Sequence, residues 1–212
     1  MKIAAVIPAY NEAKNIGRVL APLQKCPEIT EVIVVNDGST DGTGQMARKM
    51  GAQVIELPMN QGKGAAVMAG VNATTAEVIL LLDADLIGLT PQHVRELLTP
   101  IFTQQAVMTI GYFTAGRLAT DLSQQMAPYL NGQRAVRREF FAALPALTHS
   151  KYGLEVVMSH YARVNHCKVV WVGLPNLSHL MKEEKIGMLR GFAARLRMYW
   201  QIIKVLVAVR LS

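Results

Sequence analysis

Several features that mark large classes of protein are missing from this sequence. It has no run of ~20 uninterrupted apolar residues, so we expect no transmembrane helix. The N-terminal stretch MKIAAVIPAYNE reaches Asn11 and Glu12 too soon for the apolar region of a signal peptide. The two cysteines, Cys26 and Cys167, lie far apart without metal-binding spacing, which argues against a zinc site and fits a reducing compartment. We therefore expect a cytoplasmic protein.

The motifs of three nucleotide-binding folds are also missing. No GxGxxG follows the first apolar stretch, which argues against a nicotinamide-binding domain. The segment GKGAA, residues 62–66, contains the lysine of a P-loop but neither its spacing nor its Ser/Thr. The loop after the first apolar stretch also lacks the Gly-rich, Arg-containing sequence that a sugar nucleotidylyltransferase would have. A different kind of site has to be sought.

The chain does have a composition typical of a globular protein, with 51% hydrophobic and 17% charged residues. The formal net charge of +7 is unevenly distributed, because residues 1–133 carry −2 and residues 134–212 carry +9. Such asymmetry predicts that the second half meets an anion, such as nucleic acid, a membrane surface or a phosphorylated substrate. Few aromatic residues are interleaved with the basic ones and no nucleic-acid motif is present, so no nucleic-acid partner is expected.

Apolar strands alternate with helices over the first half of the chain. Continuous apolar strands joined by helices predict parallel pairing and an α/β sheet. Thr90 as N-cap and Pro91 at the first helical position mark the start of one helix. Strands are expected at 2–10, 31–37, 52–58, 76–85, 106–113 and 167–175. Helices are expected at 11–25, 39–51, 62–74, 90–102, 132–144, 153–165 and 188–211.

Polar residues follow each predicted strand of the first half. The clusters are PAYNE, NDGSTDGT, MNQGKG and DAD, in chain order. Ligands of open α/β sheets bind at the carboxyl ends of the strands, so these clusters predict one shared site. Asp83 and Asp85 suit a hard divalent cation such as Mg²⁺ or Mn²⁺. The alternative for this pair is a cap on the next loop, but the neighbouring clusters favour the metal.

These motifs carry a resemblance to a known family. The segments VIPAYNE, VVNDGSTDGT, NQGKGAA and LLLDADL, in this order and spacing, closely resemble family 2 glycosyltransferases with the GT-A fold. NGQRAVRREFFAAL and KYGLEVVM are similar to acceptor-side segments of polyprenyl-phosphate glycosyltransferases and glucosyl-3-phosphoglycerate synthases. The resemblance implies a GT-A type (Rossmann-like), mostly parallel α/β sheet flanked by helices. It also implies metal-dependent transfer of a sugar from a nucleotide-diphosphate sugar.

The resemblance implies roles for residues on the donor side. Asp83 and Asp85 match the family's Asp-x-Asp motif and would bind the metal, with Asp85 the better candidate for direct contact and for a catalytic role. Asp37 would contact the base or ribose, the alternative being a residue that only forms a turn. Lys63 would lie near the diphosphate or base, the alternative being a solvated lysine. The other residues expected at the donor are Pro8, Ala9, Tyr10, Glu12 and Ala84. Packing for Tyr10 and a helix-start role for Glu12 are the alternatives.

On the acceptor side, the resemblance implies that His179 completes the metal site, the alternative being a structural histidine. Glu155 matches an acidic position near the acceptor and would be the general base of an inverting enzyme, or position the substrate in a retaining one. Arg134, Arg137 and Arg138 lie within five residues, and arginine binds phosphate bidentately, so a phosphorylated acceptor would explain them. The alternative is that these arginines form a solvated helix face. The residues expected to contact a phosphorylated acceptor are Arg134, Arg137 and Tyr152, with Arg138 as a weaker candidate, and Lys151 is expected beside Glu155. Arg117 and Asp121 are expected in a loop near the sugar, the alternative being a surface loop.

We expect one domain in three parts: a nucleotide-sugar half (1–115), an acceptor-side half (116–187) and a basic amphipathic helix (188–212). The helix either packs on the domain, lies on the inner face of an anionic membrane, or forms a homodimer. The expected acceptor is a polyprenyl phosphate or a phosphoglycerate-like metabolite. The alternative function is a non-catalytic nucleotide-sugar or nucleic-acid binder on the same fold.

Overall fold

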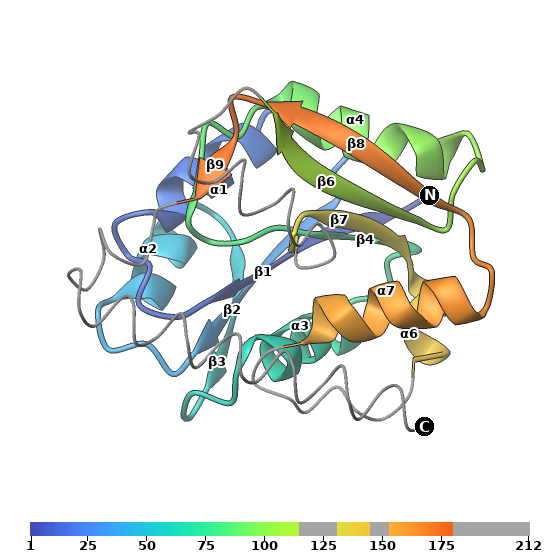
Figure 1. Ribbon diagram of the computed structural model, residues 1–212. Helices are drawn as coiled ribbons and strands as arrows, with labels where there is room; N and C mark the ends of the chain where they lie inside the picture. Colours follow the sequence, from blue (N-terminus) through green and yellow to red (C-terminus); the bar gives the residue numbers. More distant parts are fainter. Residues whose placement is uncertain (115–130, 145–152, 180–212) are drawn as a thin grey trace, which may run out of the picture.

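The computed structural model describes residues 1–114, 131–144 and 153–179 (Figure 1). A seven-stranded sheet has the order β3-β2-β1-β4-β7-β6-β8, and a second sheet pairs β5 with β9. The strands are β1 (Ile3–Ala9), β2 (Glu31–Asp37), β3 (Gln53–Leu57), β4 (Val78–Leu81), β5 (Leu86–Ile87), β6 (Met108–Thr114), β7 (Arg134–Arg137), β8 (Val169–Pro175) and β9 (Ser178–His179). The helices are α1 (Ile16–Leu23), α2 (Thr43–Lys49), α3 (Lys63–Asn72), α4 (Pro91–Phe102), α6 (Arg138–Ala142) and α7 (Leu154–Val164).

The predicted parallel sheet is confirmed for the first four strands. Strand β1 pairs in parallel with β2 and β4, and β2 pairs in parallel with β3. All of β4 is buried, and in β1 only Pro8 is partly exposed. A strand without a polar face has to be covered on both sides, which is why the apolar runs of the sequence lie at the centre of the sheet.

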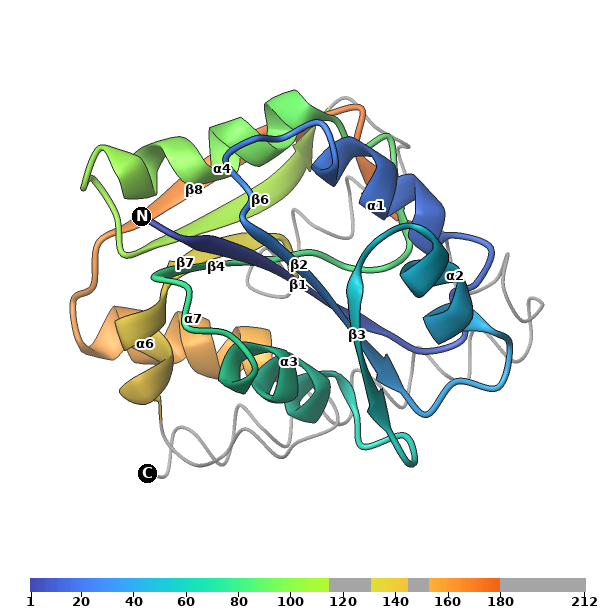
Figure 2. The same ribbon diagram turned by 180° about the vertical axis from the view of Figure 1, so that it is seen from behind.

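Helices cover both faces of the sheet (Figures 1 and 2). Helices α1, α2 and α4 pack on one face, where Leu20 and Leu97 join a core that includes Leu80 of β4. Helices α3, α6 and α7 pack on the other face, around Val67 and Phe140. The Thr90 side chain accepts a hydrogen bond from the backbone N–H of His93, so the predicted start of α4 is confirmed.

One predicted helix is wrong over its first half. Residues 132–144 were expected to be helical, but residues 134–137 form strand β7, and helix α6 covers only residues 138–142. Strand β7 lies antiparallel between β4 and β6, where Ala135 and Val136 are completely buried. Burial between two strands has overridden a helical pattern that the isolated segment could also support. Strands β6 and β8 then pair in parallel, which leaves the sheet mostly parallel.

The short antiparallel pair of β5 and β9 connects two distant parts of the chain. Leu86 pairs with His179, and Ile87 pairs with Ser178. Gly88 allows the backbone after β5 to lie close to the backbone before β9. Its φ is +85°, and a Cβ there would lie 2.5 Å from the carbonyl oxygen of Asn176. No helix within the described ranges is long and apolar enough to cross a membrane. The predicted helix 188–211, Arg117, Asp121, Lys151 and Tyr152 lie outside the described residues.

Candidate metal centre

The carboxyl ends of β1, β2 and β4 meet at one edge of the sheet, as the strand-end motifs predict. Asp83 lies two residues after the end of β4, and Asp85 directly precedes β5. Helix α3 begins at Lys63 and α7 at Leu154, so both helices start at this edge. A small cavity there is lined by Pro8, Lys63, Val67, Leu81, Leu82, Asp83, Gly132, Leu154, Glu155 and Met158. Residues from both halves of the sequence therefore converge on Asp83.

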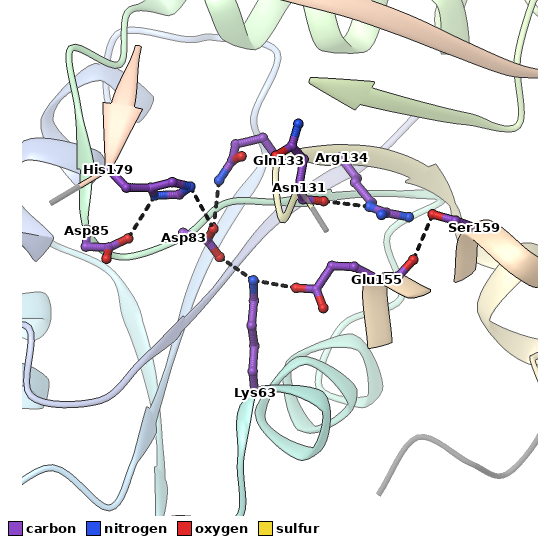
Figure 3. A network of polar contacts seen from close by, with 9 residues as sticks. All are labelled: Lys63, Asp83, Asp85, Asn131, Gln133, Arg134, Glu155, Ser159 and His179. Atoms are coloured by element: carbon purple, nitrogen blue, oxygen red, sulfur yellow. Dashed lines mark hydrogen bonds and ion pairs between the residues drawn. The ribbon is translucent and has the colours of Figure 1, made fainter. Parts of the chain in front are cut away.

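Asp83, Asp85 and His179 form a cluster suited to a metal ion (Figure 3). One potential ligand atom from each residue lies within 4.8 Å of the others. His179 Nδ1 is 3.2 Å from Asp85 Oδ1, and His179 Nε2 is 3.7 Å from Asp83 Oδ2. The pairing of β9 with β5 brings His179 to this place, because Leu86, the residue next to Asp85, is its partner.

The electrostatics of the cluster favour cations. Burial alone would lower the pKa of His179, but its hydrogen bond with Asp85 and the charges of Asp83 and Asp85 outweigh burial, so the pKa lies above its ordinary value. Burial would raise the pKa of Asp83, yet Lys63 and His179 hold that pKa below its ordinary value. Asp83 is therefore an ionised carboxylate, ready to accept hydrogen bonds or bind a cation.

Lys63 links the donor-side and acceptor-side halves of the site. Its Nζ lies 2.5 Å from Asp83 Oδ1 and 2.5 Å from Glu155 Oε1. Burial alone would lower the pKa of Lys63, but the two carboxylates raise it above its ordinary value, so the lysine is charged. Glu155 lies in the first turn of α7 and is thereby tied to α3 through this ammonium group.

Asp37 holds the loop that leads into Lys63. Its carboxylate accepts hydrogen bonds from the backbone N–H groups of Gln61 at 2.7 Å and Gly62 at 2.9 Å. The side chain of Asp37 is buried at the end of β2. In this arrangement Asp37 fixes the start of α3, while its predicted contact with the base or ribose stays a prediction.

The other predicted donor-side residues lie near the ends of β1 and β4. Pro8 lines the cavity beside Asp83, whereas Ala9 and Ala84 are buried. Tyr10 is half exposed at the end of β1. Glu12 is nearly buried: its backbone N–H donates to Thr43 Oγ1 and its carboxylate accepts from Asn15 Nδ2 at 2.7 Å, close to the start of α1. Nucleotide contacts for these residues stay predictions.

The arginines of β7 lie differently from the prediction. Arg137 pairs with Val78 at the start of β4, the far end from Asp83, and its guanidinium donates to the carbonyl oxygen of Ile101. Arg137 is therefore separated from Asp83 by the length of a four-residue strand, and its expected contact with an acceptor stays a prediction. Arg138 donates to the carbonyl oxygen of Val71 at 2.9 Å.

Arg134 lies closer to Asp83 than Arg137 does, but its side chain is completely buried. Its Nε donates to the carbonyl oxygen of Asn131 at 2.9 Å. Burial lowers the pKa of Arg134 to about 10, and the charges of Glu155 and Asp83 partly offset this. Arg134 thus lies beneath the site as a buried cation, and its expected contact with an acceptor stays a prediction.

Two site residues, Gly132 and Gln133, were missed. A Cβ on Gly132 would lie 2.5 Å from Lys63 Nζ and 2.6 Å from both carboxylate oxygens of Asp83, so only glycine allows this approach. Gln133 Nε2 donates to Asp83 Oδ2 at 2.9 Å. The Asn-Gly pair was a visible signal for a close backbone approach, but nothing in the sequence marked Gln133, which was expected on a helix.

A model of the family described as Glycosyl transferase family 2 matches residues 4–172. The chain belongs to glycosyl transferase family 2. The predicted resemblance, the enzyme class and the mostly parallel GT-A type sheet flanked by helices are thereby confirmed.

Two curated relatives represent the two acceptor types that were expected. Glucosyl-3-phosphoglycerate synthase of Mycolicibacterium smegmatis is 28% identical over 213 residues, covering 84% of this chain and 70% of that protein. Dodecaprenyl-phosphate galacturonate synthase of Rhizobium johnstonii is 29% identical over 122 residues, covering 53% of this chain and 36% of that protein. The family 2 chain therefore spans only part of each relative.

Crystal structures of glucosyl-3-phosphoglycerate synthase from Mycobacterium tuberculosis are also similar. One complex holds Mn²⁺, UDP and glucosyl-3-phosphoglycerate, and its TM-score is 0.78 at 26% identity, covering 98% of this chain and 79% of that chain. Another holds Mg²⁺ and UDP, with the same TM-score, identity and coverage. The similar proteins thus bind the divalent metals that the sequence predicts, and the Asp83, Asp85 and His179 cluster is a matching candidate site.

Proposed function

We propose that this family 2 glycosyltransferase moves a sugar from a nucleotide-diphosphate sugar to a phosphorylated acceptor, with Mg²⁺ or Mn²⁺ at Asp83, Asp85 and His179. The observation that carries the proposal is the convergence of these three residues within 4.8 Å at the carboxyl edge of the sheet. Lys63, a charged residue at the start of α3, faces the same point.

The donor atoms of the cluster fit the proposed metals. Two carboxylates offer the oxygen ligands that Mg²⁺ and Mn²⁺ prefer, and the imidazole is better suited to Mn²⁺ than to Mg²⁺. When bound, such an ion supplies charge stabilisation to the departing diphosphate. The side chains of Asp83, Asp85 and His179 keep 17%, 23% and 27% of their surface exposed, so a small ion can reach the cluster from solvent.

Lys63 and Glu155 have complementary parts in this proposal. Lys63 binds the donor diphosphate, because it is a fixed positive charge at the start of a helix whose free N–H groups also favour anions. Glu155 orients Lys63, to which its carboxylate lies 2.5 Å away. The general-base role predicted for Glu155 requires the carboxylate to leave Lys63 and stays a prediction.

A phosphoglycerate-like metabolite is the acceptor that we favour. The relatives that cover most of this chain are named glucosyl-3-phosphoglycerate synthases, and their structures contain phosphoglyceric acid or its glucosyl product. The net charge of +9 on residues 134–212 suits a small phosphorylated carboxylic acid. A polyprenyl phosphate is the second candidate, because of the Rhizobium relative.

Release of nucleoside diphosphate from UDP- and GDP-sugars tests the proposal. We expect turnover with Mn²⁺ or Mg²⁺ and 3-phosphoglycerate, and its loss with EDTA. Asp85→Ala should abolish turnover, whereas Glu56→Gln, which removes a carboxylate from a surface ion pair with Arg48, should retain it. Full turnover by Asp85→Ala would refute the metal role. Turnover with a polyprenyl phosphate but not with 3-phosphoglycerate would show that the acceptor is a polyprenyl phosphate.

Residues 188–211, for which a membrane or dimer contact was expected, lie outside the described residues. Peripheral membrane binding, a homodimer and a cytoplasmic location stay predictions. Flotation with anionic vesicles would test the first. A protein that binds nucleotide-sugar or nucleic acid without any turnover would restore the non-catalytic alternative.

A further inference from the structure

The carboxylate of Asp83 is held at both of its oxygens. Oδ1 lies 2.5 Å from Lys63 Nζ, and Oδ2 accepts a hydrogen bond of 2.9 Å from Gln133 Nε2. Figure 3 shows Gln133 and Lys63 reaching Asp83 from different sides. Oδ2 is also the oxygen that faces His179 Nε2, at 3.7 Å. Because a carboxylate oxygen can accept more than one partner, the bond from Gln133 leaves Oδ2 able to bind a cation.

The main chain, rather than the ligand site, sets the position of Gln133. The residue immediately precedes β7, and its carbonyl oxygen accepts a 2.8 Å hydrogen bond from the backbone N–H of Gly111 in β6. Its side chain is completely buried. Gly132, without a side chain, brings this segment against Asp83 and Lys63. The amide therefore stays directed at Asp83 whether or not a ligand is present.

The amide of Gln133 is kept despite a cost. Its Oε1 is buried and accepts no hydrogen bond within the described part of the chain. A buried acceptor without a partner costs about 1–3 kcal/mol, and an apolar side chain of the same length would avoid that cost. Since Oε1 is sealed from solvent, it is not available to a substrate. What the amide provides is the N–H group on Asp83.

We propose that Gln133 is a positioning residue for the metal centre, and that its N–H group orients Asp83 so that Oδ2 faces the ion shared with Asp85 and His179. This inference rests on the proposed function. Partners that orient metal ligands typically change metal affinity by about 10- to 100-fold when they are removed. The same range is expected here, because Asp83 without Gln133 can turn toward Lys63.

Gln133→Met tests the role, because methionine matches the length of glutamine without a donor or acceptor. Thr109→Val is the matched control: Thr109 is also fully buried beside β7, where its hydroxyl donates to Leu97 O at 2.8 Å and accepts from Ala135 N at 3.1 Å. The measurements are Mn²⁺ affinity without donor, from the electron paramagnetic resonance signal of free Mn²⁺, and thermal unfolding in EDTA.

We expect Gln133→Met to bind Mn²⁺ about 10- to 100-fold more weakly than the natural chain, with an unfolding temperature that is unchanged or higher. Its Mn²⁺ activation constant should rise while kcat at saturating Mn²⁺ changes little. Thr109→Val should be less stable but bind Mn²⁺ normally.

Normal Mn²⁺ binding by Gln133→Met, or a larger loss of stability than in Thr109→Val, would overturn the role of Gln133 alone. A natural chain that binds no Mn²⁺ would instead overturn the proposed function, and with it this inference.

Discussion

Replacing Lys63 by methionine should have opposite effects on metal binding and on catalysis. The ammonium group of Lys63 lies 2.5 Å from a carboxylate oxygen of both Asp83 and Glu155. Lys63→Met keeps most of the apolar stem and removes the ammonium group, with its charge and its hydrogen-bond donors. In the metal-free protein this leaves two carboxylates without their common partner. It also frees Asp83 for a cation.

The structure allows the size of both effects to be worked out. Removing one partner of a buried ion pair costs about 3–5 kcal/mol. The side chain of Lys63 keeps 31% of its surface exposed, so solvent screens part of the loss and we expect about 2–3 kcal/mol. Two unit charges 4 Å apart repel by about 4 kcal/mol at an effective dielectric constant of ~20. Even strongly screened, the relief of that repulsion should tighten Mn²⁺ binding by ~10-fold, or about 1.4 kcal/mol.

Urea unfolding in EDTA and in saturating Mn²⁺ measures both effects on the same protein. We expect Lys63→Met to be less stable than the natural chain in EDTA, and to regain more stability than the natural chain when Mn²⁺ is added. Sugar transfer should fall because the donor diphosphate loses a fixed positive charge. Mn²⁺ binding that is weaker than in the natural chain would refute the reasoning, because Lys63 would then support the metal rather than compete with it.

Two further predictions follow from His179 and Glu155. The pKa of His179 is raised in the folded protein, so in EDTA its contribution to stability is fully present below the unfolded pKa of 6.5 and is lost as pH rises through the folded pKa. In saturating Mn²⁺ the stability should instead rise over the same pH range, because only the neutral imidazole binds metal. Urea unfolding across pH checks this, and His179→Gln should remove both dependences. Glu155→Gln should raise the donor KM more than it lowers kcat, because Lys63 loses the carboxylate that orients it toward the donor diphosphate. A fall in kcat of about 10²- to 10⁴-fold at constant donor KM would instead establish Glu155 as general base.

The sequence predicted best where a residue's surroundings follow from local pattern. Continuous apolar runs predicted parallel strands, and β1, β2 and β4 lie where expected because such runs have few alternatives to the centre of a sheet. The strand-end aspartates followed from that placement, since the carboxyl ends of parallel strands share one edge. Thr90 and Pro91 marked the start of α4 for an equally local reason.

Predictions were wrong where a long-range contact decided the conformation. Residues 134–137 were assigned to a helix, because the segment can be read as helical on its own. In the fold they form a strand between β4 and β6, whose register carries Arg137 to the end of the sheet opposite Asp83. No periodicity within the segment contains this information, because the pairing partners lie about 25 to 60 residues earlier in the chain.

The contrast between His179 and Gln133 shows how a metal ligand differs from the residue that orients it. His179 was expected at the metal because of the family resemblance, and the structure places its ring beside Asp83 and Asp85. Gln133 has a side chain found throughout protein surfaces, and its meaning comes only from complete burial next to Asp83. Orienting residues of this kind become visible when the polar atoms of the interior are matched with partners. Among the described residues, the side-chain N–H group of Gln133 has a partner and its side-chain oxygen, Oε1, has none. An amide with that imbalance marks a place where the fold accepts a cost in stability, here directly behind the proposed metal ligand.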